Sequence, residues 1–510
     1  MKSLLWVFPV LLALSPLRSA AQQTLSTDTL LTRVLQPADM QADFRYFRRL
    51  LEETHPGLYR YVPRTVMQAK LDSIDRTLTQ PLPFYTFFGI VAELIGEIRC
   101  AHTHALPSKN WREQFNGTLK TIPFYLFPAS QRSYVLLNGT SDQTIHPGFE
   151  LIAINGQSLE SIRQRLYRYY WADGYIESAR MATLKGELFA LFYYWFIDQP
   201  GTFAFTFSSL AGDTVHVSAP AQPFATTLKT MRQNPVNKQM VAWHVRKKAK
   251  HPWRLSFPND IEQTAFLRLD GFGGEGVSNG DQAITVFRQF MDKSMAKIAK
   301  KGAKNLIIDL RGNAGGWDSQ GIELFTYLMK TDTAVPYYAR QHSVTDSTEF
   351  LQFSDLSDAD RRHVKQELIR ESDGTFTLKQ GSDTREPMRY AAKPNRFKGR
   401  VYILMNGSSA STASEFLAVA HANNVGIFVG EESGGAYEGG NGSSFITLEL
   451  PKSGIQVTTP LVYYRNAVPE PTRKGRGTMP DYTVPIPITD ILNHTDSQRS
   501  RVNELIQQTR

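Results

Sequence analysis

The segment from residue 400 to residue 430 places a serine-rich turn between a buried strand and a helix. Val401–Met405 is a short apolar run that predicts a buried strand, and Asn406–Ser409 has turn chemistry. From Ser411 onward apolar residues recur at helical spacing, and Val425–Val429 predicts a second buried strand. This order of strand, turn, helix and strand favours an α/β layer with crossover helices.

The serines of this turn have two interpretations. The first N–H groups of a helix lack partners within the helix, so they can stabilise negative charge that forms beside them. A hydroxyl at this place is therefore well situated to act as a nucleophile. Ser408, Ser409 and Ser411 are also ordinary helix-capping residues, and this segment by itself favours capping.

A second segment, residues 304–316, changes that balance. Leu306–Ile308 predicts another buried strand, which runs into Asp309 and then into a turn that contains Gly312, Gly315 and Gly316. Glycine allows unusual backbone angles and a close approach to a ligand. A strand that ends in bare N–H groups, beside a strand that ends in serine, is how an acyl-transfer site is built.

Together these residues resemble the S41 peptidases, the family of tail-specific (C-terminal processing) proteases and tricorn core proteases. Four motifs carry the resemblance in the family's order. They are D-L-R-G-N-x-G-G at 309–316, S-x-x-S-E-F at 411–416, V-G-E at 429–431 and G-x-x-P-D-Y-x-V at 477–484. The resemblance implies a serine-type peptidase that acts on protein or peptide substrates and needs no cofactor.

The serine motif can be aligned in two registers. Counting back from Glu415, as in the tail-specific proteases, makes Thr412 the nucleophile. Counting forward to Phe416 and to the 429–431 motif, as in the tricorn-like branch, makes Ser411 the nucleophile. The second register keeps the spacing without a gap, so we predict Ser411 and keep Thr412 as the alternative.

The resemblance also implies the general base. In the tricorn-like branch a helical N-terminal part ends in a G-H-T type sequence that brings a histidine to the site. Here Ala101 stands where glycine or serine is usual, and His102 matches the histidine. Tail-specific proteases instead use a lysine in G-K-G, but residues 434–436 read Gly-Gly-Ala. We therefore predict His102 as the base, since histidine suits a serine hydroxyl near neutral pH; a capping or packing histidine is the structural alternative.

An acid that follows the serine completes the site in that branch. Glu470 is the best-placed candidate, and Glu431 and Glu438 are its rivals. Glu415, one helical turn after Ser411, is expected to pack or pair locally.

Backbone N–H groups are expected to hold the oxyanion. The resemblance places one donor at Thr412 and the second at Gly315 or Gly316. The sequence contains neither an H-E-x-x-H nor a paired-cysteine pattern, so no metal site is predicted.

The N-terminus predicts export. A short basic start is followed by the apolar run Leu4–Leu14 and by the small residues Ser19, Ala20 and Ala21, which is typical of a signal peptide cut before Gln22. No later run approaches the length of a membrane span. The mature protein is expected to be soluble and periplasmic or secreted.

Composition excludes few classes of protein. The chain has 510 residues and a net charge of +9 that is spread along it, with the densest basic run at Arg246–Lys250. We interpret this run as a solvated linker, because no nucleic-acid-binding motif accompanies it. The single cysteine, Cys100, cannot form an internal disulfide and is expected to be a packed small side chain.

The fold class expected is multidomain α/β. Its parts are a signal peptide at 1–21, a helical part at 22–117, a PDZ-like β-rich domain at 118–224, a linker at 225–255, a ClpP/crotonase-like catalytic domain at 256–495 with an insertion at 340–395, and a tail at 496–510. The PDZ-like expectation rests on a single segment, the strand and Asn-Gly turn of residues 147–156 with the following helix at 158–170. The oligomeric state is not predicted.

Two functions follow. The first is an exported serine endopeptidase in which His102 activates Ser411. The alternative is a non-proteolytic protein that binds a small molecule or a peptide on the same fold, as relatives such as the interphotoreceptor retinoid-binding proteins do. Covalent labelling of Ser411 by a serine-reactive probe separates the two.

Overall fold

The computed structural model describes residues 33–109, 111–113, 119–244, 252–274, 277–378 and 387–508. The predicted signal peptide and the basic run at 246–250 lie outside these residues. None of the described helices combines the length and the apolar character that a membrane span requires.

Three helices form the first part of the described chain. They are α2 (Pro37–Thr54), α3 (Arg64–Thr77) and α4 (Phe84–Ile98), preceded or joined by the paired strands β1 (Val34–Leu35) and β2 (Leu82–Pro83) and followed by β3 (His104–Leu106). Phe44, Phe47 and Leu51 recur on one face of α2 and are fully buried. Helix α4 ends at Ile98, and the left-handed φ of 57° at the next residue, Arg99, turns the chain toward β3.

The middle of the chain is an antiparallel sheet in the order β10-β9-β7-β6-β5. Its strands are β5 (Phe124–Ala129), β6 (Arg132–Asn138), β7 (Glu150–Ile154), β9 (Thr202–Ser208) and β10 (Thr214–Pro220), and the accompanying elements are β4 (Lys120–Thr121), β8 (Gln157–Ser158), α6 (Leu159–Tyr167), α7 (Glu177–Thr183), α8 (Gly186–Phe196) and β11 (Gln222–Pro223). The expected strand, Asn-Gly turn and helix are β7, the turn at Asn155 and Gly156, and α6. That this region is PDZ-like stays a prediction.

The expected linker at 225–255 is ordered and packed over its first twenty residues. It contains α9 (Phe224–Gln233), the 3₁₀ helix η2 (Pro235–Asn237), α10 (Lys238–His244) and the strand β12 (Trp253–Ser256). The reason is that Met231 and Met240 are buried in one cluster with Leu136 and Leu137 of β6. This segment contains apolar side chains at helical spacing, but the charged residues beside them favoured the interpretation of a linker.

The catalytic sheet has the order β12-β13-β14-β20-β21-β24. Its strands β13 (Thr264–Leu269), β14 (Asn305–Asp309), β20 (Arg400–Met405), β21 (Ile427–Gly430) and β24 (Tyr482–Thr483) are parallel, and β12 is antiparallel to β13. The strands expected around Leu306 and Val401 are therefore neighbours, paired at Leu306 and Val401 themselves. Both end at the same edge of the sheet, as the motif argument required.

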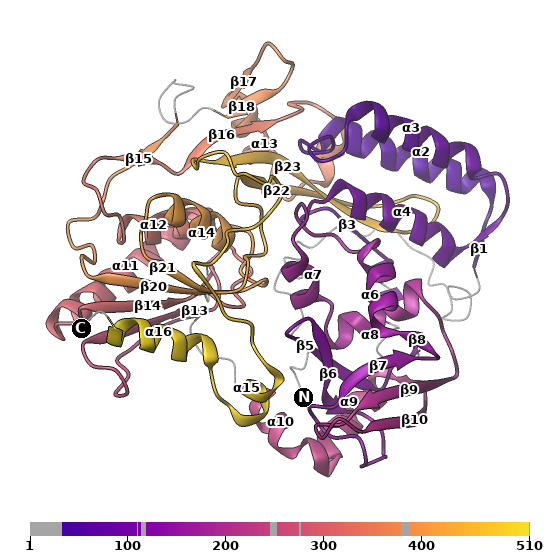
Figure 1. Ribbon diagram of the computed structural model, residues 1–510. Helices are drawn as coiled ribbons and strands as arrows, with labels where there is room; N and C mark the ends of the chain where they lie inside the picture. The colour runs from indigo at the N-terminus through magenta and orange to yellow at the C-terminus, as the bar shows by residue number, and fades with distance from the viewer. Residues whose placement is uncertain are drawn as a thin grey trace.

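Helices cover both faces of this sheet. On one face lie α11 (Gly280–Lys300), α12 (Asp318–Thr326) and α14 (Thr412–Ala422), and on the other lies α16 (Ser497–Gln508), which follows α15 (Ile488–Asn493) (Figure 1). The expected tail at 496–510 is thus a packed helix over its described residues. Its Val502, Leu505 and Ile506 are buried against Tyr402 and Leu404 of β20.

A second sheet joins the catalytic part to the N-terminal helices. Its order is β17-β18-β16-β23-β22, and β3 pairs with β23. Its elements are β16 (Tyr338–Ser343), β17 (Leu368–Arg370), β18 (Phe376–Leu378), β22 (Gly439–Glu449) and β23 (Gln456–Asn466), with β15 (Val335–Pro336), η3 (Glu349–Phe353), α13 (Asp358–Gln366) and β19 (Arg389–Tyr390) alongside. The insertion at 340–395 therefore supplies strands to this sheet, and it also contains helix α13.

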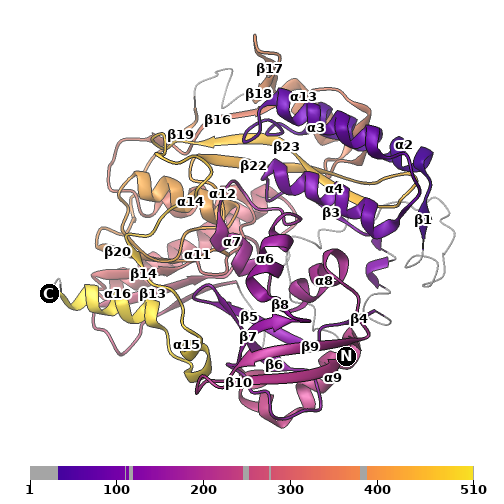
Figure 2. The same cartoon turned by 45° about the vertical axis from the view of Figure 1, so that its right-hand side comes forward.

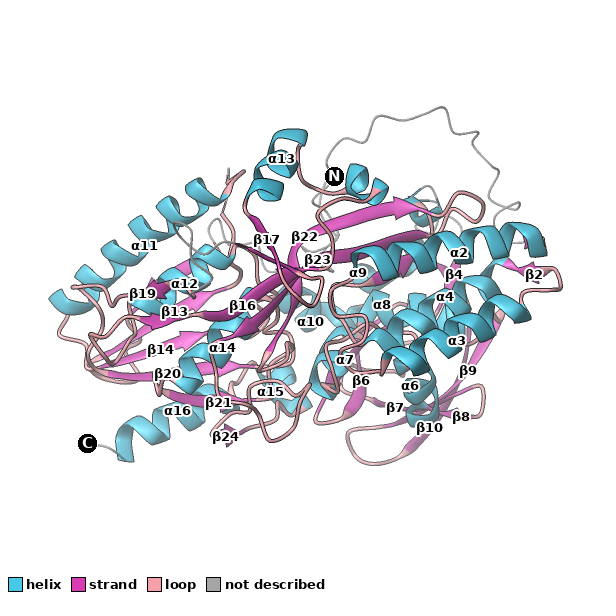
Figure 3. Ribbon diagram, turned by 90° about the horizontal axis from the view of Figure 1, so that it is seen from above, coloured by secondary structure: helices cyan, strands magenta, loops and turns pink. Residues whose placement is uncertain are grey.

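The long hairpin β22–β23 runs from the catalytic sheet to the helices α2 and α4, as the views in Figures 2 and 3 show. Ile446, Leu448 and Val457 of this hairpin belong to the same buried cluster as the N-terminal helices and the middle sheet. The carboxylate of Asp43 in α2 accepts hydrogen bonds from the backbone N–H groups of Lys452 (2.9 Å) and Ser453 (2.6 Å) at the hairpin tip. These contacts hold the N-terminal helices against the catalytic part.

Candidate active site

Ser411 lies at the sharp turn between β20 and α14. It has φ 52° and ψ −132°, a region that only glycine enters without strain, and such a conformation costs about 1–3 kcal/mol. The residue is partly exposed, and its Oγ makes no hydrogen bond within the described part of the chain. A strained backbone that presents a free serine hydroxyl is the arrangement of a nucleophile elbow.

The turn that precedes Ser411 is held by Ser409, the second of its three serines. Ser409 Oγ donates a hydrogen bond to the Leu310 carbonyl (2.9 Å) and accepts one from the N–H of Asn406 (3.1 Å). Ser409 is fully buried. The serine therefore ties the end of β20 to the end of β14, and it is unavailable as a nucleophile.

The glycine turn after β14 lies directly against Ser411. A Cβ built on Gly315, which has φ 98°, would lie 2.6 Å from Ser411 Cβ and 2.9 Å from the Thr412 nitrogen. Thr412 Oγ1 is bonded to the Gly316 carbonyl (2.9 Å) and to Asp318 Oδ1 (3.0 Å), and the residue is fully buried. The structure thus brings Ser411, Thr412, Gly315 and Gly316 together. The Thr412 hydroxyl is already engaged in hydrogen bonds, whereas the Ser411 hydroxyl has none among the described residues.

The N–H groups around Ser411 are not equivalent. The N–H of Gly315 donates to Asn313 Oδ1 (2.9 Å), so it is already used inside the turn. The N–H groups of Gly316 and Thr412 have no acceptor within the described residues. N–H groups without an acceptor close to a serine are able to bind an anion.

His102 lies in the turn between α4 and β3. Its ring is tilted over Phe445 of β22 with the centroids 5.5 Å apart, and its Cε1 is 3.9 Å from the Cβ position of Gly442. Its Nδ1 is buried and has no partner among the described residues. No hydrogen bond joins His102 to Ser411 in this structure, although His102 lies within electrostatic range of Asp318, the partner of Thr412.

Buried acids surround the first turn of α14. Burial raises the pKa of the Glu415 carboxyl to about 8, and the neighbouring charge of Asp318 adds to the increase. The Tyr338 hydroxyl donates a hydrogen bond to Glu415 Oε2, and Tyr464 lies beside the same carboxyl. Burial also raises the pKa of Asp318. Glu415 therefore pairs locally, as expected, and it is mostly protonated at neutral pH.

Glu470 lies apart from these residues. Its side chain is 60% exposed and forms an ion pair with Arg465 of β23, and no hydrogen bond or ion pair joins it to Ser411 or His102 among the described residues. Of its rivals, Glu438 accepts hydrogen bonds from Arg60 (3.0 Å) and from the N–H of Gly475 (2.8 Å). Burial raises the pKa of Glu431. Among the described residues, no hydrogen bond or ion pair joins any of these three carboxylates to His102.

The other histidines of the N-terminal part and the cysteine are packed. Burial lowers the pKa of His55 and of His104 to about 4, so both are neutral at pH 7. His55 Nε2 is 2.8 Å from Thr103 Oγ1. Burial raises the pKa of the Cys100 thiol to about 11, which leaves it without thiolate character at neutral pH.

Three residues of the site escaped the sequence argument. Asp318 follows the glycine motif by two residues and was not considered, although an acid in the first turn of a helix beside a glycine turn was a readable signal. Asn313 is inside the quoted motif. Its side-chain Oδ1 accepts a hydrogen bond from the N–H of Gly315, and its Nδ2 donates one to the Leu269 carbonyl (3.1 Å). Asp173 is 4% exposed and comes from a distant segment, so no local pattern could have identified it.

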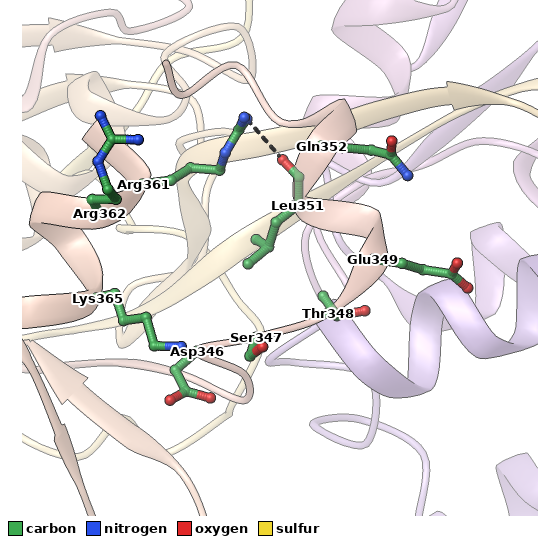
Figure 4. Close-up of a pocket in the computed structure, with 9 residues that line it drawn as sticks. All are labelled: Asp346, Ser347, Thr348, Glu349, Leu351, Gln352, Arg361, Arg362 and Lys365. Carbon is green, nitrogen blue, oxygen red and sulfur yellow. Dashed lines mark hydrogen bonds between the residues drawn. The ribbon is translucent and has the colours of Figure 1, made fainter. Parts of the chain in front are cut away.

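A separate pocket lies on the insertion, between η3 and α13 (Figure 4). Its volume is about 460 Å³, and none of the residues discussed above lines it. Arg361 closes one side with a hydrogen bond from its Nη1 to the Leu351 carbonyl (3.1 Å). Within the described residues no group of three or more His, Cys, Asp or Glu side chains is arranged to hold a metal ion.

The catalytic part of the chain matches a known family of peptidases. Residues 263–484 match the model of peptidase family S41, and this range contains β14, the glycine turn, Ser411 and α14. No curated protein matches the chain.

Solved structures share the fold over most of the chain. The crystal structure of mature CPAF is similar at 17% identity over 92% of this chain and 97% of that chain, with a TM-score of 0.58. Mature CPAF complexed with lactacystin is similar at 17% identity over 92% and 98%, with a TM-score of 0.59. With the serine elbow in place, residues 263–484 are a serine-type peptidase region of family S41.

Proposed function

We propose that the protein is an exported serine endopeptidase in which Ser411 attacks the peptide carbonyl of a protein or peptide substrate. The observation that carries this assignment is the strained backbone of Ser411, whose Cβ lies against Gly315 and whose hydroxyl has no hydrogen-bond partner among the described residues. Strain of this kind persists where the surrounding structure enforces it, and it is concentrated at functional sites. The neighbouring Thr412 has a normal helical position and an occupied hydroxyl, which favours Ser411 over the alternative.

The oxyanion of the tetrahedral intermediate would be held by the N–H groups of Thr412 and Gly316. Neither donor has an acceptor within the described residues, whereas the Gly315 N–H bonds Asn313. Of the two glycines that the sequence offered, Gly316 is therefore the better donor. Asn313 and the Thr412 hydroxyl would keep this turn in place through their bonds to Gly315 and to the Gly316 carbonyl.

His102 is the proposed general base, which takes the Ser411 proton and returns it to the leaving amine. Its place between α4 and β3 supports this role, as does its Nδ1, which has no hydrogen-bond partner in the described part of the chain. Because Ser411 and His102 come from different parts of the chain, substrate binding must bring them within hydrogen-bond distance, as happens in many enzymes whose free form is looser.

Glu470 remains the proposed third residue on the resemblance alone. Its carboxylate pairs with Arg465, so it would have to leave that ion pair to approach His102. If it takes part, Glu470→Gln lowers kcat, and if it only pairs with Arg465, Glu470→Gln and Arg465→Met have the same small effect.

The decisive experiment compares the mature protein from Gln22 with Ser411→Ala, Thr412→Ala and His102→Ala on casein and on a peptide library. A fluorophosphonate probe, followed by peptide mapping, identifies the labelled residue. We expect Ser411→Ala and His102→Ala to be inactive, Thr412→Ala to be partly active, and the label to be on Ser411. A folded wild type that neither cleaves nor becomes labelled would favour the binding protein instead.

Export rests on the sequence of the first 21 residues. N-terminal sequencing of the protein recovered from the periplasm or the medium should begin at Gln22. Recovery of the uncut chain from the cytoplasm would contradict the proposal.

A further inference from the structure

A buried carboxylate outside the family motifs adjoins the proposed base. Asp173 lies in the segment between α6 and α7, outside the residues that match the S41 model, and it is 4% exposed. Burying a carboxylate is costly unless hydrogen bonds or opposite charges compensate. The partners of Asp173 therefore indicate what it does.

One partner is the turn that carries His102. Asp173 Oδ1 accepts a hydrogen bond from the N–H of Ala101 (2.8 Å), the residue directly before His102. The next residue, Gly174, donates its N–H to the Arg99 carbonyl (3.0 Å), and Arg99 Nη1 donates to the Gly174 carbonyl (3.3 Å). Three hydrogen bonds thus join residues 173–174 to the end of α4.

The same segment is held by the catalytic part of the chain. The N–H of Tyr175 donates to the Gly475 carbonyl (2.7 Å). A Cβ on Gly174, which has φ 51°, would lie 2.2 Å from that same carbonyl oxygen, so only glycine fits. Residues 173–175 are therefore fixed between the His102 turn and the catalytic part.

The carboxylate and the imidazole lie on one face of β22. Asp173 Oδ2 is 3.7 Å from the Cβ position of Gly440, and His102 Cε1 is 3.9 Å from that of Gly442. Alternate residues of a strand point to the same side and are roughly 7 Å apart. Because Gly440 and Gly442 have no side chains, there is room beside β22 for the Asp173 carboxylate and the His102 imidazole.

The charges around Asp173 are consistent with an electrostatic interaction between the Asp173 carboxylate and the His102 imidazole. Burial raises the pKa of Asp173, and among the influences that lower this pKa His102 is the largest, followed by the Ala101 N–H and by Arg60. The negative charge of Glu438, in contrast, raises the pKa of Asp173. Tyr464 and Glu415 also lie within electrostatic range of the Asp173 carboxylate. A positive charge on His102 and a negative charge on Asp173 therefore stabilise each other.

We infer that Asp173 is a positioning residue for His102: it holds the turn that carries the imidazole and supplies the negative charge that stabilises the imidazolium during the reaction. This inference rests on the proposed function, in which His102 is the base. It assigns to the segment between α6 and α7 a part in completing the site, so that three separate stretches of the chain contribute to it.

The test separates the charge from the hydrogen bond. Asp173→Asn keeps an oxygen for the Ala101 N–H and removes the charge, whereas Asp173→Ala removes both. Asp43→Asn is the matched control, because Asp43 is also buried, also accepts backbone N–H groups across parts of the chain, and has no histidine as partner. The readouts are the pH profile of kcat/KM on casein-derived peptides and hydrogen exchange of the peptide that contains residues 99–103.

We expect Asp173→Asn to lower kcat/KM about tenfold or more, within the range of general-base effects. In this variant the acidic limb of the pH profile of kcat/KM should move to lower pH, because the negative charge of Asp173 no longer favours the imidazolium form of His102. Exchange at residues 99–103 should stay slow in Asp173→Asn and become faster in Asp173→Ala. Asp43→Asn should change neither the limb nor this exchange.

A purely structural role gives a different pattern. If Asp173→Asn keeps the wild-type pH profile and stays within twofold in kcat/KM, the inference is wrong, even when His102→Ala is inactive. If His102→Ala retains full activity, or the wild type has none, the proposed base fails and the inference fails with it. Hydrogen exchange then still reports whether Asp173 holds the turn.

Discussion

Gly315 and Ser411 are in contact so close that no larger residue fits at the glycine. A methyl group on Gly315 would lie 2.6 Å from Ser411 Cβ and 2.9 Å from the Ala410 carbonyl oxygen. The glycine, at φ 98°, adopts an angle that suits only glycine, and it lies against the strained backbone of Ser411 at φ 52°. The geometry of each depends on the other.

Gly315→Ala should abolish most of the activity. The methyl group must displace Ser411 or the glycine turn, and a misplacement of about 1 Å near the reacting atoms costs on the order of 100-fold in rate. Gly302→Ala is the control, because Gly302 also has a positive φ of 62° but has nothing within 4 Å of its Cβ position. Peptidase assays and melting temperatures of both variants check the expectation, and an active Gly315→Ala would show that the contact is unimportant.

Thr412→Val should weaken the enzyme without inactivating it. The substitution keeps the shape and removes the hydroxyl that is hydrogen-bonded to the Gly316 carbonyl and to Asp318, which costs about 1–3 kcal/mol in unfolding free energy because the half-buried Asp318 carboxyl loses this partner. Thr412→Ser should restore most of both properties. Denaturant unfolding and kcat measure the two effects. A dead Thr412→Val beside an active Ser411→Ala would instead make Thr412 the nucleophile.

Glu415→Gln should make stability less dependent on pH. Burial raises the pKa of Glu415 to about 8, above the ordinary value of 4.5, so the folded state binds a proton that the unfolded state releases between these values. The stability that this proton contributes is complete below about pH 4.5 and is lost as pH rises through about 8, with a slope of up to about 1.4 kcal/mol per pH unit.

The glutamine variant mimics the protonated acid toward Tyr338 and has no proton to lose. The wild type should therefore lose unfolding free energy relative to Glu415→Gln between pH 5 and pH 9. Urea unfolding of both proteins across this range measures the difference, in which the other titrating groups largely cancel. Parallel curves for the two proteins would mean that Glu415 is ionised when folded.

Arg60→Met should destabilise the contact between the N-terminal helices and β22. Arg60 and Glu438 are 12% and 11% exposed in their side chains and are 3.0 Å apart, so removal of the arginine leaves a buried charge uncompensated, at a cost of roughly 3–5 kcal/mol. The double variant Arg60→Met/Glu438→Gln should regain most of the loss, because the glutamine still accepts the Gly475 N–H.

Arg45→Met is the control for that pair. Arg45 and Asp75 form an exposed ion pair, 3.2 Å long with side chains 63% and 27% exposed, and its loss should cost less than about 1 kcal/mol. Chemical denaturation of the four proteins gives the comparison. Equal losses for Arg60→Met and Arg45→Met would show that the buried pair adds nothing to the docking of the helices.

Much of the local architecture could be read from the sequence. The apolar runs around Leu306 and Val401 are strands, and the helical pattern that begins at Ser411 is helix α14. Periodicity identifies such elements because each must bury one face or both. The same reasoning missed the packing of residues 225–244 and of the C-terminal helix, where charged neighbours obscured a few apolar residues that find a partner surface only in the folded protein.

The sequence by itself determined the family, the two adjoining strands and the short list of hydroxyls, since these depend on residue type and spacing within continuous segments. Only the tertiary structure decided which backbone N–H groups lack an acceptor among the described residues and that the Thr412 hydroxyl is hydrogen-bonded. It also decided that Glu470 pairs with Arg465 and that Asp173 adjoins the turn of His102. Hydrogen bonds and charges act over a few ångströms, and segments hundreds of residues apart reach that distance only when the chain has folded.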